Sequence, residues 1–276
     1  MINQESVMRK IIVGILCCLA MSPFLGLRAE TTEVGVVVLH GKWDRPNGLI
    51  LDFSSAMERA GYRVRTPEMP WSGRRSYDAG VAVMEAEIDA AVEQLRQQGA
   101  QVIIVAGHSF GAAGAIRYAT RHKVDAVIAL APGHYPEGKY FTNLTAVSRN
   151  RAQALIDDGK PDENGWFDDP NSGGRLKQVK MSARTYLDFF DPDGPMNFGN
   201  NAAAVLPGTA VLWVVGQGEE SGLKAMAGRV FERLPKELAA RQIDVPGGHL
   251  ETPSNSAGVA LDWIRSLKAG PAPAAR

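Results

Sequence analysis

The sequence predicts an α/β fold: a doubly wound, mostly parallel sheet with an inserted cap. Apolar strands alternate with amphipathic helices from residue 34 onward, the order produced by parallel strands joined through right-handed crossovers. A strand, a sharp turn and a helix follow one another directly within residues 101–114. The stretch between Pro132 and Pro207 lacks a clear core strand and is too long for a simple connection, which predicts the cap.

The elements before the cap are identified by their periodicity. A β-branched apolar run indicates each buried strand, and apolar residues at helical spacing indicate each helix. We expect strands at Val34–Leu39, Tyr62–Thr66, Val102–Ala106 and Val124–Ala131, and helices at Leu49–Arg59, at Val81–Gln97 and from the residues after Ser109 to about Arg121.

The cap, at about residues 135–206, is followed by the rest of the sheet. Within the cap we expect a helix near Leu144–Ile156, a polar loop at Asp157–Arg175 and a small aromatic core, one or two of whose members also line the pocket. After the cap we expect a strand at Ala210–Val215, a helix near Leu223–Leu234, a short strand at Ile243–Val245 and a final helix at Ser254–Leu267 capped by Ser254.

The two ends of the chain differ from the rest in composition. Arg9 and Lys10 precede an apolar stretch, and Ala29 stands at a plausible cleavage point, so residues 1–29 are expected to be a signal peptide. Export to the periplasm or beyond would leave a domain at residues 30–268. The alternative is an uncleaved N-terminal helix that anchors the chain in the membrane. The Pro/Ala-rich residues 269–276 are expected to be a disordered tail.

Composition excludes several classes of function. Hydrophobic residues make up 45% of the 276 positions and charged residues 22%, which allows a large core. The chain has 30 basic and 30 acidic residues and no basic stripe, so nucleic-acid binding is not predicted. Cys17 and Cys18 lie in the predicted signal peptide, so the mature chain has no cysteine for disulfides, thiol catalysis or metal ligation.

A G-x-S-x-G pentapeptide spans residues 107–111, between an apolar run and a helix-forming run of small residues. A strand that ends abruptly in a helix forms a sharp turn, whose apex residue is held in a strained conformation. Gly107 and Gly111 suit this turn because a Cβ at either position would crowd the strand or the helix. Ser109 is lifted above the carboxyl end of the strand, and we predict that it is a nucleophile.

A serine nucleophile needs a base and an acid that orients the base. His249 is the predicted base, since it follows the last strand in a glycine-containing loop that can bend toward Ser109. Glu219 and Glu220 both follow the preceding strand. We prefer Glu219 as the acid, and Glu220 is the alternative.

Backbone N–H groups would stabilise the oxyanion that forms on attack. We expect one from Phe110, at the positive end of the helix after the nucleophile. The other is expected from Lys42, in the loop after the first strand, with the N–H of Trp43 as second choice. Trp43, His134 and Tyr135 flank the predicted mouth of the substrate pocket.

Four short segments together resemble the α/β-hydrolase superfamily, and Ser109, Glu219 and His249 follow the chain order of its triad. The resemblance covers roughly residues 34–134 and 208–267. It implies an eight-strand type of sheet, a Ser-His-acid triad, and neither metal nor cofactor. Many relatives have Asp where this chain has Glu219. The four segments are residues 37–41, 107–111, 216–219 and 248–249.

These features predict an exported serine hydrolase that cleaves a small-molecule carboxylic ester through an acyl-enzyme on Ser109. Amide or peptide cleavage and acyl transfer could use the same residues, and a non-catalytic binding protein on the same fold is a further alternative. No stable membrane insertion is expected after signal cleavage. The natural substrate stays open, because a fold hosts many activities.

Overall fold

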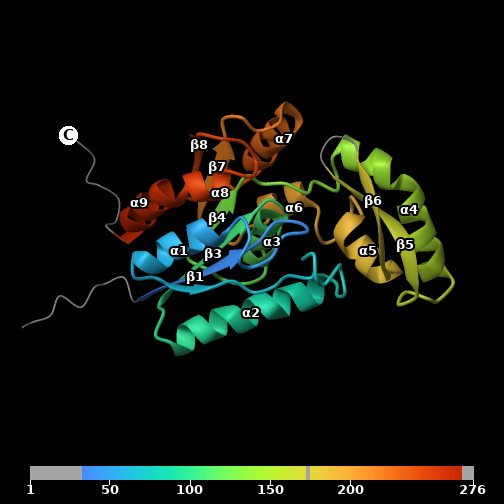
Figure 1. The fold of residues 1–276 in the computed structure, drawn as a ribbon, viewed down its shortest axis with the longest axis horizontal. Helices are drawn as coiled ribbons and strands as arrows, with labels where there is room; N and C mark the ends of the chain where they lie inside the picture. Colours follow the sequence, from blue (N-terminus) through green and yellow to red (C-terminus); the bar gives the residue numbers. More distant parts are fainter. Residues whose placement is uncertain (1–32, 172–174, 269–276) are drawn as a thin grey trace, which may run out of the picture.

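The computed structural model describes residues 33–171 and 175–268, which Figure 1 shows as a ribbon. The predicted signal peptide and the predicted tail lie outside the described residues. Six parallel strands form one sheet in the order β2-β1-β3-β4-β7-β8. Their bounds are β1 Val34–Leu39, β2 Arg63–Arg65, β3 Val102–His108, β4 Ala126–Leu130, β7 Ala210–Gly216 and β8 Ala240–Val245.

Helices cover both faces of this sheet, so its central strands are buried on both sides and have almost unbroken apolar sequences. The predicted doubly wound α/β fold is therefore confirmed. The sheet has six strands within the described residues, fewer than the eight-strand type that the resemblance implied. One face packs against α1 (Leu51–Arg59) and α9 (Ala257–Lys268), and the other against α2 (Val81–Gln97), α3 (Phe110–Ala119) and α7 (Ser221–Phe231).

The predicted final helix is wrong at its start. The structure divides this segment into a short α8 (Thr252–Asn255) and α9, and Ser254 lies inside α8 rather than capping a helix. The Ser254 hydroxyl donates to the carbonyl of Glu251. Pro253 stands in the first turn of α8, where a missing N–H costs nothing, and this permits the earlier start.

The segment between β4 and β7 forms a lobe of its own and one further helix. Figure 1 shows α4, β5, β6 and α5 grouped beside the sheet, whereas α6 lies against α3. We call α4, β5, β6 and α5 the cap lobe. The bounds are α4 Lys139–Asp157, β5 Asn164–Pro170, β6 Leu176–Ser182, α5 Ala183–Phe190 and α6 Phe198–Ala203.

The polar loop predicted at Asp157–Arg175 is wrong, because residues 164–170 within it form strand β5. Strand β5 pairs antiparallel with β6, and Phe167 packs inward while Trp166 faces solvent. Stacked rings of Phe167, Tyr186 and Phe190 form the core of the cap lobe, with centroid separations of 4.6 and 4.7 Å. Asp168 and Asp169 are charged, and this composition favoured the prediction of a loop. In the folded chain both carboxylates accept hydrogen bonds, which allows them to lie in a strand.

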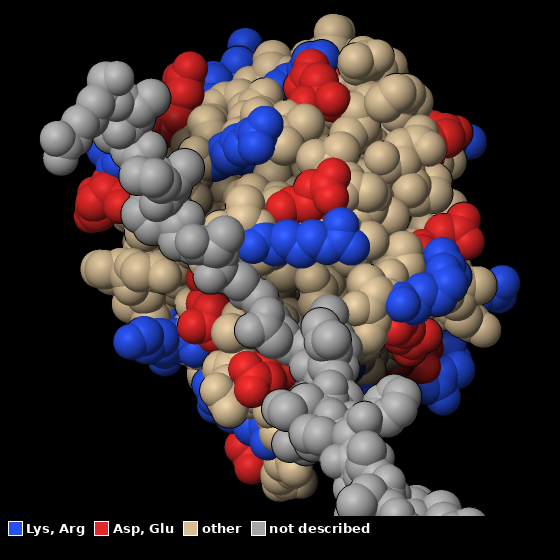
Figure 2. All heavy atoms as spheres, turned by 90° about the vertical axis from the view of Figure 1, so that its left-hand side faces the viewer, with Lys and Arg blue, Asp and Glu red and all other residues tan. Residues whose placement is uncertain are grey.

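The end of the molecule opposite the cap lobe carries mixed charge. Figure 2 looks onto the left-hand side of Figure 1, and Lys and Arg side chains are interspersed there with Asp and Glu. This matches the equal numbers of basic and acidic residues in the sequence.

Candidate active site

The turn between β3 and α3 places Ser109 at its apex in a rare backbone conformation, with φ 54° and ψ −115°. Strain of this kind persists where the surrounding structure enforces it. An ideal Cβ on Gly107 would lie 2.1 Å from the carbonyl oxygen of Gly111, and one on Gly111 would lie 2.4 Å from the oxygen of Leu39. Only glycine fits at either position, since the strand and the helix pass this closely.

Ser109 begins a chain of hydrogen bonds that joins three separate loops. Its Oγ lies 2.9 Å from Nε2 of His249, and Nδ1 of His249 lies 2.7 Å from Oε2 of Glu219. A carboxylate only accepts, so Nδ1 carries the imidazole proton and Nε2 accepts the serine hydroxyl. The Glu219 side chain is 3% exposed and that of His249 is 22% exposed, so substrate can reach the histidine while the carboxylate is shielded from water.

The two candidate acids occupy different places. Glu219 follows β7 and turns inward to His249, and its second oxygen accepts the backbone N–H of Glu220 at 3.0 Å. Glu220 stands exposed at the start of α7. The structure thus brings Glu219, and not Glu220, to His249.

The side chain of His108 holds the backbone of His249 in place. Nε2 of His108 donates to the carbonyl of His249 at 3.0 Å. Burial, together with the neighbouring His249 ring, lowers the pKa of His108 to about 3, so this ring stays neutral. A neutral ring in this position fixes the His249 backbone without adding a charge beside Ser109.

The loop after β1, residues 40–44, is named the β1 loop. The carbonyl of Gly41 accepts from Nδ1 of His40 at 2.8 Å and from the N–H of Asp44 at 3.3 Å. Nε2 of His40 accepts the N–H of Met69, which fixes the ring orientation. In a trans peptide the N–H points opposite to the carbonyl, so these bonds direct the N–H of Lys42 the other way.

The same reasoning applies to the N–H of Phe110. The carbonyl of Ser109 accepts from the N–H groups of Ala112 and Gly133, at 3.0 and 3.2 Å. The N–H of Phe110 belongs to the same peptide plane and points outward from the start of α3. Gly41 lies against the nucleophile, since its ideal Cβ would be 3.4 Å from Cβ of Ser109. The N–H groups of Lys42 and Phe110 therefore belong to segments that flank Ser109.

Trp43 is tied into the structure at both its backbone and its side chain. Its N–H, the second choice for the oxyanion, donates to the carbonyl of Trp71 at 2.9 Å and is engaged there. Its indole Nε1 donates to Oδ2 of Asp169 at 2.7 Å.

The other two residues predicted for the pocket are buried. His134 stacks on Phe110 with ring centroids 3.6 Å apart and donates to the carbonyl of Phe189, and burial lowers its pKa well below the ordinary value. Tyr135 donates its hydroxyl to the carbonyl of Pro132. Neither side chain lies at an open surface, at 6% and 3% exposure.

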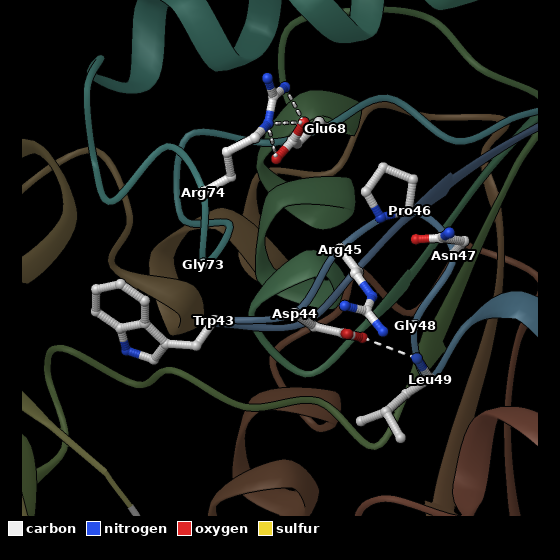
Figure 3. A pocket seen from close by; sticks show the side chains of 10 residues that line it. All are labelled: Trp43, Asp44, Arg45, Pro46, Asn47, Gly48, Leu49, Glu68, Gly73 and Arg74. Atoms are coloured by element: carbon white, nitrogen blue, oxygen red, sulfur yellow. Dashed lines mark hydrogen bonds and ion pairs between the residues drawn. The ribbon is translucent and has the colours of Figure 1, made fainter.

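A cavity of about 790 Å³ opens beside the β1 loop. Figure 3 shows that the indole of Trp43 extends away from the side chains of Asp44 and Arg45, and that Glu68 pairs with Arg74 at the far wall. Ser109 is not among its lining residues, so this cavity adjoins the site rather than containing it. The lining residues are Trp43, Asp44, Arg45, Pro46, Asn47, Gly48, Leu49, Glu68, Gly73 and Arg74.

The described residues contain neither a candidate metal cluster nor a candidate membrane-spanning helix. Over 33–171 and 175–268, no three His, Cys, Asp or Glu side chains gather in a way that could hold a metal ion. In the same part of the chain, no helix combines the length and apolar character needed to cross a bilayer.

Comparison with known proteins identifies the family. The model of the alpha/beta hydrolase family matches residues 36–260, so the chain belongs to this family. No curated protein sequence matches it.

Three solved structures illustrate the range of its structural neighbours. A monoacylglycerol lipase from Paleococcus ferrophilus is 21% identical, with 84% of this chain and 94% of that chain covered and a TM-score of 0.58. Est1E from Butyrivibrio proteoclasticus, solved with ferulic acid, is 15% identical, with 85% and 89% covered and a TM-score of 0.59. A putative non-heme bromoperoxidase, BpoC, from Mycobacterium tuberculosis is 17% identical, with 84% and 92% covered and a TM-score of 0.58. At these identities the similarity shows the fold.

Gly133 and Asp169 were not predicted as part of the site. Gly133 follows β4, and an ideal Cβ there would lie 2.9 Å from Oγ of Ser109. Asp169 on β5 is completely buried against the β1 loop. A glycine beside a predicted strand end was the only sequence signal for Gly133. The carboxylate of Asp169 gave none, because its partners Lys42 and Trp43 lie 127 and 126 residues away in the chain.

Proposed function

We propose that the protein is a serine hydrolase that cleaves a carboxylic ester of a small molecule through an acyl-enzyme on Ser109. The observation that carries this proposal is the unbroken hydrogen-bonded series from Ser109 through His249 to Glu219. It stands at the carboxyl ends of parallel strands, where open α/β sheets bind ligands. The monoacylglycerol lipase among the structural neighbours supports a small-molecule ester.

The chemistry follows from the geometry. As Oγ of Ser109 attacks the ester carbonyl, its proton passes to Nε2 of His249, and Glu219 stabilises the imidazolium that forms. The N–H groups of Lys42 and Phe110 stabilise the oxyanion. His249 then gives the proton to the leaving alcohol, and a water molecule activated by His249 hydrolyses the acyl-enzyme.

A fluorophosphonate probe tests the nucleophile. The wild-type protein should be labelled on Ser109, and Ser109→Ala should not be labelled, because the phosphonate bonds to the serine oxygen. Intact mass and peptide mapping give the readout. A folded wild type that stays unlabelled would point instead to a non-catalytic binding protein.

Matched substrates test the reaction class. A series of p-nitrophenyl esters of graded acyl length should be hydrolysed faster than p-nitroanilides with the same acyl groups, since p-nitrophenolate can leave without a proton whereas the anilide nitrogen must first be protonated. Faster cleavage of the anilides would favour an amidase. Transfer of the acyl group to an added alcohol in preference to water would favour an acyltransferase.

We further propose that the protein works outside the cytoplasm. Support comes from the basic, apolar and small-residue pattern of residues 1–29. Fractionation of cells that express the full chain, with N-terminal sequencing of the product, tests this. Cytoplasmic protein with an intact N-terminus would contradict it, and uncleaved protein in the membrane fraction would support the anchored alternative.

A further inference from the structure

A carboxylate of the cap lobe holds the side chains of the β1 loop. Asp169 on β5 is fully buried, and its Oδ1 accepts from Nζ of Lys42 at 2.6 Å. Its Oδ2 accepts from the indole Nε1 of Trp43 at 2.7 Å and from the hydroxyl of Tyr77 at 3.2 Å. The next residue, Pro170, offers its carbonyl to the same ammonium group of Lys42. The side chains of the consecutive residues Lys42 and Trp43 therefore both bind to strand β5 of the cap lobe.

Strand β6, which pairs with β5, also contacts Trp43. Lys177 on β6 is the cross-strand partner of Asp169. Its Nζ lies 3.4 Å from the centroid of the Trp43 ring, where a cation is attracted by the ring face. One cross-strand pair thus holds Trp43 at two points, with the carboxylate at the edge of the indole and the ammonium over its face.

The backbone of Trp43 shows that this loop needs such support. Trp43 has a φ of 62°, which is unfavourable for a bulky side chain and persists only where the surroundings enforce it. Its peptide nitrogen is engaged with Trp71, and the N–H of Lys42 lies one residue earlier. Rotation of the Trp43 backbone toward a relaxed conformation would turn the neighbouring peptide planes and displace the N–H of Lys42.

We propose that Asp169 is a positioning residue, which couples the cap lobe to the oxyanion site by holding Lys42 and Trp43 in place. The proposal rests on the proposed function for its catalytic consequence, although the loop geometry itself can be measured without any activity. An aspartate suits the task because three donors converge on it and a carboxylate only accepts. An asparagine would present an N–H₂ group to at least one of these donors.

Asp169→Asn tests the coupling, with Asp168→Asn as a matched control. The control makes the same change at the adjacent residue, whose carboxylate contacts Ser148 and Gln178 within the cap lobe. We expect Asp169→Asn to lower kcat about tenfold to a hundredfold with little change in KM, as a displaced oxyanion donor would. The inhibition constant of an alkyl trifluoromethyl ketone, which forms a tetrahedral oxyanion on serine, should rise by a similar factor. Asp168→Asn should change neither.

Hydrogen–deuterium exchange gives a readout that does not require turnover. The N–H groups of Trp43 and Asp44 are bonded to Trp71 and Gly41, and their exchange should become faster in Asp169→Asn but not in Asp168→Asn. If the wild type neither labels nor hydrolyses esters but the exchange difference appears, the proposed function fails while the coupling stands. Equal exchange in the two variants, or equal losses of kcat, would overturn the coupling.

A second variant covers the case in which Asp169→Asn does not fold. Trp43→Phe removes the indole N–H that the β1 loop donates to Asp169. It retains an aromatic ring beneath Lys177, and Asp169 keeps its hydrogen bonds to Lys42 and Tyr77. It should also lower kcat and speed exchange of the Asp44 N–H. A folded Trp43→Phe protein with wild-type kcat and exchange would overturn the proposal independently.

Discussion

At the scale of single residues, the site depends on the free space around Ser109 as well as on its hydrogen bonds. The hydrogen bonds that join Ser109, His249 and Glu219 span 2.9 and 2.7 Å, and small residues surround them. Gly41 and Gly133 both approach Ser109 so closely that a side chain would contact it. Of the two, Gly133 leaves room that the nucleophile needs, since a Cβ there would lie 2.9 Å from Oγ of Ser109.

The two adjacent glutamates give a direct test of the acid. Glu219→Gln should lower kcat by about 10⁴-fold, because the amide cannot stabilise the imidazolium. Glu220→Gln should leave kcat nearly unchanged, since its side chain is exposed and does not contact His249. Steady-state kinetics on one ester measures both. A larger loss in Glu220→Gln would contradict the proposed triad.

Gly133→Ala tests the role of clearance. The new Cβ would lie 2.9 Å from Oγ of Ser109 and 3.5 Å from Cε1 of His249. We expect kcat to fall about tenfold to a hundredfold, because the nucleophile must shift to make room. Gly258→Ala in α9 is the control, since nothing lies within 4 Å of its added Cβ. Equal activity in the two variants would show that the Ser109 side chain tolerates this neighbour.

At the scale of elements, the cap lobe has a small core of its own. Strand β5 alternates a buried Phe167 with Trp166, which is 58% exposed. Phe167 stacks on Tyr186, and a cation–π contact with Arg151 adds to its packing. The lobe also reaches the sheet domain through Asp188, whose carboxylate accepts the first N–H of α2 at 3.0 Å. The packing within the cap lobe therefore helps to position β5 against the β1 loop.

Adjacent aromatic residues test this core. Phe167→Ala should lower the free energy of unfolding by about 3–5 kcal/mol, since it removes a fully buried ring and leaves a cavity. Trp166→Ala should cost far less, because more than half of that side chain already contacts water. Urea denaturation followed by circular dichroism measures both. Similar losses in the two variants would mean that the buried ring of Phe167 contributes no more to the stability of the cap lobe than the exposed ring of Trp166.

At the scale of the whole molecule, three of the five histidines are buried and depend on remaining neutral. Burial lowers the pKa values of His40 and His134 below the ordinary value and that of His108 to about 3. In the unfolded chain a histidine binds a proton near pH 6.5. As pH falls below about 6.5, the unfolded state binds more protons than the folded state, so acid destabilises the fold.

The pH dependence of stability follows from these shifts. Each buried histidine should contribute up to about 1.4 kcal/mol of lost stability per pH unit below about pH 6.5. For His108 this loss should continue toward its folded pKa of about 3. Urea midpoints between pH 7.5 and 5 measure the slope. Stability that stays constant or rises on acidification through this range would show that these rings are protonated in the folded protein.

The sequence alone determined the alternating order of strands and helices along the chain, the sharp turn at Ser109 and the position of His249 after the last strand. These are local features: apolar periodicity selects strands and helices, and the spacing of Gly107 and Gly111 selects the turn. The sequence analysis predicted a loop where β5 lies, because the strand contains Asp168 and Asp169, whose hydrogen-bond partners lie outside the strand.

Only the tertiary structure decided which glutamate meets His249, which peptide planes face Ser109 and what Asp169 contacts. Glu219 and Glu220 are chemically identical neighbours, and only the direction of the chain after β7 turns one of them inward. Asp169 lies 127 positions from Lys42 and 126 positions from Trp43 in the chain. Contacts over such separations leave no local pattern in a sequence, because they arise only when the packed sheet and cap lobe bring distant segments together.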